Sequence, residues 1–194
     1  MKKIALLIFM LGSISISKAQ SLFEGTPITI GYFGHWGIHP GMKIGTDLNL
    51  KSWQKEKEKK KITVTKTRSL FVSPELGFYS HNQNHQGLLL NVDIGYRKIK
   101  DRFGLYSAFS VGIGYMRQFN AGVTYDAQDD GSFKKKALPS RGYFLPTLNY
   151  EFGQEINQRW GWFGKFSVGA KMPYNTGVVA ETYFESGLRI NLNK

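Results

Sequence analysis

The most regular feature of the chain is an alternation of apolar residues with polar or small residues between Gly87 and Gln118. A period of two is typical of β-strands, because successive side chains point to opposite faces. The turn-forming residues 100–104 divide this segment, so it predicts two antiparallel strands. One face, from Leu88 to Tyr96, is apolar and uncharged, whereas the other face of the pair holds Asp, Arg, Asn and several Gly. Apolar residues outside and polar residues inside are typical of a membrane β-barrel.

The same alternation recurs along the rest of the chain, with an irregularity expected at Pro74, which has no N–H for the strand ladder. The expected strands span residues 28–36, 41–53, 63–80, 87–99, 105–118, 142–153, 160–172 and 178–192. This pattern predicts an all-β fold, namely an eight-stranded antiparallel transmembrane up-and-down β-barrel. The long segment 119–141 is predicted as an extracellular loop. The charge run 54–61 is predicted as a solvated periplasmic hairpin tip, with binding of anionic headgroups as the alternative.

The first nineteen residues have the pattern of a cleaved secretory signal peptide. Basic residues at 2–3 precede an apolar run over 4–11, and small residues lie just before Gln20. The apolar run is too short to span about 30 Å of hydrocarbon as a helix. We therefore expect a signal peptide at 1–19 and a barrel domain at 20–194. Its removal takes away three lysines, so the formal charge falls from +12 to +9 (12 − 3). The chain has no Cys, which excludes disulfides and thiolate metal sites.

Charged residues fall on the faces that are predicted to point into the barrel, and none falls on the lipid-facing side of the same strands. The inward acids are Asp47, Glu75, Asp93, Glu151, Glu181 and Glu185, and the inward bases are Lys43, Lys51, Arg97, Lys165, Lys171 and Arg189. A balanced set can pair across an interior that is just wide enough for side chains. The sequence thus predicts a plugged, ion-paired lumen. A soluble up-and-down barrel, the alternative fold, would have the opposite sorting.

With its signal, paired strands and polar-in, apolar-out alternation over residues 28–193, the chain resembles the small OmpA/OmpX-type outer-membrane β-barrels of Gram-negative bacteria. This resemblance implies an outer-membrane location and insertion by the barrel-assembly machinery. The C-terminal residues 191–194 depart from the family, because they lack its common terminal Phe. The family includes structural proteins, adhesins and lipid A-modifying enzymes, so the fold does not determine the function.

Three groups of residues are candidates for chemistry. The four histidines, His35, His39, His81 and His85, are all placed at the extracellular rim, where imidazoles can bind zinc or copper or remain ordinary loop side chains. Ser80, His81 and Glu75 are the residue types of a hydrolase, and such a triad would resemble the outer-membrane lipid A deacylases. Adjacent Ser80 and His81 would, however, point to opposite faces of a regular strand.

The third group, Lys134, Lys135 and Lys136, can hold lipopolysaccharide phosphates or form a solvated loop tip. Every Gly-x-Gly lies within a predicted strand, so no cofactor is expected, and basic patches with stacking aromatics, as in nucleic-acid-binding proteins, are missing. The expected function is a non-enzymatic role in envelope structure or surface interaction, with outer-membrane lipids and lipopolysaccharide as partners. A lipid A-modifying hydrolase and a narrow passive channel are the alternatives, and the oligomeric state is left open.

Overall fold

The computed structural model describes residues 26–59, 62–82, 84–100, 102–123, 125–129, 131–135, 139–174 and 177–191, so the predicted signal peptide lies outside the described residues. The strands are β1 (Pro27–His35), β2 (Gly41–Thr46), β3 (Leu48–Lys59), β4 (Ile62–His81), β5 (His85–Lys100), β6 (Leu105–Asn120), β7 (Tyr125–Ala127), β8 (Phe133–Lys135), β9 (Ser140–Glu155), β10 (Trp160–Tyr174) and β11 (Gly177–Asn191). Among these residues, no helix is long and apolar enough to cross a bilayer.

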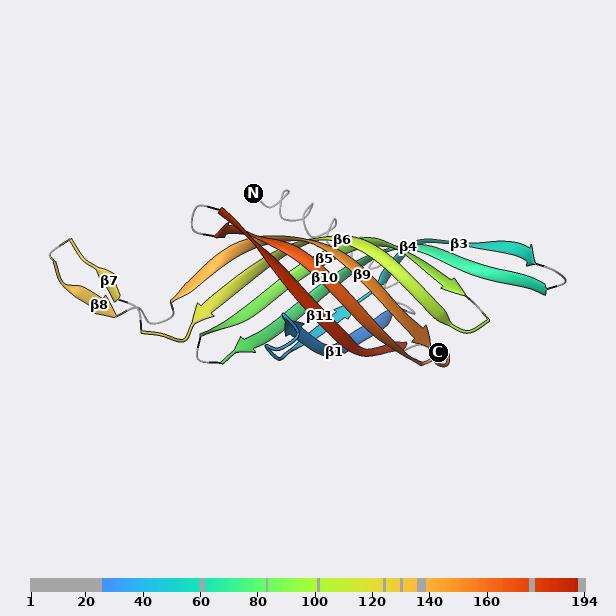
Figure 1. Cartoon of the computed structure of the whole chain (residues 1–194), viewed down its shortest axis with the longest axis horizontal. Coiled ribbons are helices and arrows are strands. Elements are labelled where there is room, and N and C mark those ends of the chain that lie inside the picture. Colours follow the sequence, from blue (N-terminus) through green and yellow to red (C-terminus); the bar gives the residue numbers. More distant parts are fainter. Residues whose placement is uncertain are drawn as a thin grey trace, which may run out of the picture.

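The large sheet closes on itself as an antiparallel barrel (Figure 1). Its order is β2-β1-β11-β10-β9-β6-β5-β4-β3, and an additional β2–β4 pairing joins the two ends. β2 and β3 follow one another along the same position in the ring, since both pair with β4. The ring therefore contains eight strands, and the predicted all-β, eight-stranded antiparallel barrel is confirmed.

The division between β2 and β3 lies opposite Pro74, where an irregularity was predicted. Pairing of β2 with β4 ends at Gly45 and Glu75 and resumes at Leu48 and Val72. Proline cannot donate to the ladder, and the Ser73 hydroxyl instead donates to the Thr46 carbonyl over 3.0 Å. The interruption is thus a consequence of a single missing N–H.

The charge run was expected to form a hairpin tip, but Gln54 to Lys59 belong to strand β3. They pair in continuous register with β4 as far as Ile62. β4 pairs with β5 only from Lys66 onward, so the ends of β3 and β4 continue past the barrel as a two-stranded ribbon (Figure 1). The run is therefore extended because β4 continues to pair with it beyond the barrel wall.

The two ends of the barrel carry different connections. At the end that we call distal, the chain turns between β1 and β2, β4 and β5, β6 and β9, and β10 and β11. At the proximal end lie the start of β1, the end of β11 and the β3–β4 ribbon. The predicted 119–141 loop contains a small hairpin of β7 and β8, which pair only with each other and project away from the barrel (Figure 1).

Candidate functional site

The outer surface of the barrel is an apolar belt. Exposed side chains from all eight positions of the ring include Ile30, Ile44, Leu76, Leu88, Leu90, Val92, Ile94, Phe109, Val111, Ile113, Phe144, Leu148, Tyr150, Phe152, Phe166, Val168, Phe184 and Leu188. Among the described strand residues, outward charges lie only near the two ends of the barrel, such as Arg117 at the distal end and Lys98 at the proximal end. A soluble protein rarely exposes an apolar surface of this extent.

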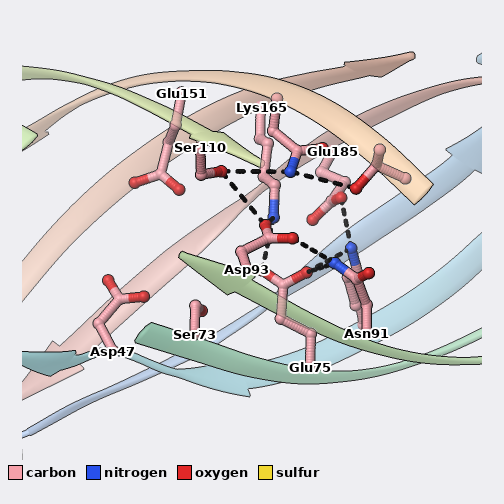
Figure 2. A network of polar contacts seen from close by, with 12 residues as sticks. Asp47, Ser73, Glu75, Asn91, Asp93, Ser110, Glu151, Lys165 and Glu185 are labelled. Carbon is pink, nitrogen blue, oxygen red and sulfur yellow. Dashed lines mark hydrogen bonds and ion pairs between the residues drawn. The ribbon is translucent and has the colours of Figure 1, made fainter. Parts of the chain in front are cut away.

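The centre of the lumen is filled by a group of ion pairs from opposite walls. Lys165 on β10 places its Nζ 2.6 Å from Glu75 Oε1 and 2.7 Å from Asp93 Oδ2. Lys43 on β2 lies 2.7 Å from the other oxygen of Glu75 and 2.6 Å from Glu185. Figure 2 shows Lys165 reaching toward Asp93 and Glu75 from across the barrel. Strands far apart in the sequence are thus linked through buried charges.

Neutral polar side chains complete this central group. Asn91 and Ser110 donate to the Asp93 carboxylate (Figure 2), and Asn149 donates to Ser110 over 3.2 Å. Gly112 on β6 makes room for the group, because a Cβ at this position would overlap the Asp93 carboxylate and the Thr147 hydroxyl. The glycine is therefore required by close packing inside the barrel.

A second group of charges lies toward the proximal end. Asp47, at the break between β2 and β3, is 2.6 Å from both Arg97 and Arg189. Glu151 is 3.1 Å from Arg97 and 3.8 Å from Arg189. The two guanidinium groups also lie over the ring of Tyr106. Below them a cavity of about 560 Å³ opens at the proximal mouth, with Arg189 among its lining residues.

The distal half of the lumen is closed by a buried aromatic and apolar layer, which the alternation did not single out. It consists of Phe33, Tyr79, Leu89, Met116, Tyr143, Leu145 and Tyr183. Phe33 stacks on Tyr183 at 5.1 Å between ring centroids and meets Tyr79 edge-on at 6.1 Å. The alternation places these residues on the inward faces, next to the charged ones. It does not predict that they contact one another, because they lie on strands that are far apart in the sequence. The layer makes the lumen a plugged interior at this level.

The four histidines come together above this layer, although their sequence spacing alone does not bring them together. The rings of His39 and His81 stack at 3.6 Å, and each has a further neighbour, His35 at 5.6 Å and His85 at 5.1 Å. His35 also contacts Glu181, which pairs with Lys171. Among the described residues, no group of three or more His, Asp or Glu side chains is arranged to hold a metal ion.

The predicted lumen set is brought together with one exception. Eleven of its twelve members form ion pairs with one another, namely Lys43, Asp47, Glu75, Asp93, Arg97, Glu151, Lys165, Lys171, Glu181, Glu185 and Arg189. Lys51, predicted to point inward, is exposed instead. The β3–β4 register shifts between Asn49 and Lys51, and this places Lys51 opposite the outward residue Leu70.

The residues of the hydrolase candidate do not form a triad. Glu75 is held in the central ion-pair group, and His81 stacks on His39 at the distal end. Ser80 follows the inward Tyr79 on β4, so its side chain points outward, away from His81. Of the loop lysines, Lys134 and Lys135 are exposed on β8, while Lys136 lies outside the described residues.

Comparisons with known proteins give weak structural likenesses only. No family model and no curated protein matches the chain. The chain is similar to the crystal structure of the outer membrane enzyme PagL, with a TM-score of 0.43 and 10% identity over 86% of this chain and 99% of the other. It is also similar to Ail, the attachment invasion locus protein of Yersinia pestis, with a TM-score of 0.29 and 11% identity over 87% and 99%.

A further likeness, to the translocator domain of the autotransporter NalP from Neisseria meningitidis, has a TM-score of 0.23 and 10% identity over 98% of both chains. At these scores and identities the likenesses define neither a family nor an activity. The architecture rests on the geometry of this chain.

Proposed function

We propose that the protein is a non-enzymatic outer-membrane β-barrel of a Gram-negative bacterium, exported by its predicted signal peptide. The observation that carries the proposal is the sorting of side chains across the barrel wall, with ion pairs inside and a continuous apolar belt outside. In water this arrangement would expose the apolar belt and bury many charges. In a bilayer it is favourable, since a cation at the midplane of the lipid face costs about 2–4 kcal/mol.

The dimensions of the belt support a membrane-spanning role. On β5 the outward apolar run extends over residues 88–96, and on β9 it extends over residues 144–152. Each run is nine residues long, and a tilted strand needs about 9–11 residues to cross the hydrocarbon core. Trp160 and Trp162 on β10 lie at the proximal border, where indole rings favour the interface.

The β7–β8 hairpin is the part of the molecule best placed for surface interaction. It carries Tyr125 and Phe133, whose side chains are 58% and 73% exposed, next to Lys134 and Lys135. Because both termini of the barrel lie at the proximal end, the distal end would face the outside of the cell. Exposed aromatics beside cations suit a surface partner or lipopolysaccharide phosphates. Insertion would use the barrel-assembly machinery.

Two other functions find less support. Hydrolysis would need a base beside Ser80, and His81 points to the opposite face. A passive channel would need an open lumen, whereas buried side chains such as Arg97, Tyr79, Tyr183 and Met116 occupy the interior at several levels.

One experiment tests the proposal and its alternatives together. The protein is expressed with its native leader, and the outer-membrane fraction is run on gels with and without heating. A folded barrel should migrate differently in the two lanes, and lipid A from cells with and without the gene should have the same mass spectrum. A protein that stays monomeric in detergent-free buffer would refute the membrane location, and a lipid A mass change that Ser80→Ala abolishes would favour the hydrolase. Planar-bilayer conductance should be close to zero for the plugged barrel.

A further inference from the structure

The proximal rim carries a one-sided arrangement of positive charge on β3, β4 and β5. Directly opposed residues of antiparallel strands share a face, so the pairing of the strands defines rows of neighbouring side chains. The three rows are Lys51–Leu70–Tyr96, Trp53–Arg68–Lys98 and Lys55–Lys66–Lys100. We call these nine residues the basic face. Leu70 is exposed on the outer surface of the barrel, which shows that the basic face points outward.

The sorting of charge on this face differs from that in the lumen. Six of its nine positions are cations and none is an acid. The opposite face of the same part of β3 and β4 has no cation and consists of Ser52, Gln54, Glu56, Thr65, Thr67 and Ser69. The lumen, by contrast, pairs five bases with six acids. Like charges placed directly opposite one another destabilise a sheet, and Arg68 and Lys98 stand opposite one another on this face, so it favours a nearby anion.

The position of the basic face along the barrel indicates where that anion comes from. On β5 the outward side chains run from the apolar Ile94 through Tyr96 to Lys98, and the first row continues onto the exposed Phe109 of β6. The ring centroids of Trp53 and Tyr96 lie 6.1 Å apart at this border. Along the barrel wall, apolar side chains are thus followed by amphipathic aromatic rings and then by cations. This order is typical of a membrane–water interface.

Arg68 provides a donor for such an anion. It lies at the centre of the basic face, between Trp53 and Lys98, and its side chain is only partly buried. A guanidinium matches the geometry of phosphate oxygens. Lys98 and Lys100 on the adjacent strand form no ion pair within the described part of the chain.

From these observations we infer that the basic face binds the phosphates of anionic phospholipids in the inner leaflet of the outer membrane. The inference rests on the proposed membrane location and adds a lipid class to it. The β3–β4 ribbon then lies along the headgroups, and the apolar belt next to it contacts the acyl chains. The bulge that moves Lys51 outward also places Trp53 and Lys55 on the same side.

The test compares two triple variants with equal loss of charge. K55Q/R68Q/K98Q removes cations from the basic face, and R117Q/R141Q/R159Q removes the same number elsewhere on the barrel. Each protein is folded in neutral detergent micelles, and the affinity for phosphatidylglycerol and for phosphatidylcholine is measured by native mass spectrometry. Each cation near an anionic surface strengthens binding about fivefold, so the first variant should bind phosphatidylglycerol roughly a hundredfold more weakly. The second variant should stay within about threefold of the parent protein.

Heat-modifiable migration separates failure of this inference from failure of the membrane proposal. A parent protein that does not form a heat-modifiable barrel in detergent contradicts both. A folded parent that binds the two lipids equally, or two variants that lose affinity alike, overturns the inference alone. If K55Q/R68Q/K98Q does not fold, the inference is tested by the salt dependence of phosphatidylglycerol binding to the parent protein. Phosphatidylglycerol binding must weaken as sodium chloride rises from 50 to 500 mM, and binding that is unchanged by salt overturns the inference.

Discussion

Replacing Lys165 by Met tests the ion-paired lumen where the structure makes it most vulnerable. The ammonium group lies within 2.7 Å of both Glu75 and Asp93, and the Lys165 side chain is only 3% exposed. Methionine fills a similar volume without the charge, so the substitution removes the cation and leaves the carboxylates in place. Glu75 keeps Lys43 at 2.7 Å, whereas Asp93 keeps only neutral donors among the described residues.

The magnitude follows from what remains buried. Breaking a buried ion pair by removing one partner typically costs 3–5 kcal/mol, because the other charge is left without compensation. Since Glu75 retains a lysine, we expect the lower end, about 3 kcal/mol of the free energy of unfolding. Adding Asp93→Asn removes the uncompensated charge and should restore more than half of this loss. Lys135→Met, on the exposed β8, should change stability by less than about 0.5 kcal/mol.

The assay is urea unfolding in lipid vesicles, with the folded fraction measured by heat-modifiable migration. All variants should show the same dependence of free energy on urea, so that shifts of the midpoint report stability. A loss below about 1 kcal/mol for Lys165→Met would refute the reasoning, since the buried carboxylates would then be stable without their cation. So would a double variant that is no more stable than Lys165→Met.

Three further predictions concern other parts of the molecule. Leu90→Arg, in the belt, should lower the free energy of unfolding in vesicles by about 2–4 kcal/mol. Leu50→Arg, which is equally exposed but lies on β3 near the proximal rim, should lower it by about 1 kcal/mol or less. Equal urea midpoints for the two variants would contradict the membrane assignment. Partial burial, and then the neighbouring His81 and His35, lower the pKa of His39 from its ordinary 6.5. The unfolded chain therefore binds this proton more readily, so stability should fall as the pH drops below about 6.5. Stability can be followed by hydrogen exchange of the distal turns, and His39→Gln should make its dependence on pH weaker. An unchanged pH dependence in this variant would contradict the role of His39. Replacing residues 124–136 with a short Gly-Ser linker should leave the unfolding midpoint within about 0.5 kcal/mol, because β7 and β8 pair only with each other, and a larger loss would show that the hairpin supports the barrel.

The sequence by itself determined the strands and their two faces. Alternation is a local property, so an outward Leu90 beside an inward Asn91 is visible without knowledge of any partner strand. The even strand number and the segregation of charge follow from the same pattern, and eleven of the twelve residues that it assigned to the lumen form ion pairs there. Pro74 marked the interruption of a strand because its missing N–H is a property of the residue itself.

Only the tertiary structure decided which side chains meet. Lys165 and Glu75 are ninety residues apart, and closure of the ring places them within 2.6 Å. The bulge at Leu50 is equally invisible in the alternation. It turns Lys51 outward, because one extra residue in a strand transfers every following side chain to the other face. Register and ring closure depend on pairing between distant strands, and for this reason the histidine cluster, the aromatic layer and the basic face emerge only from the folded barrel.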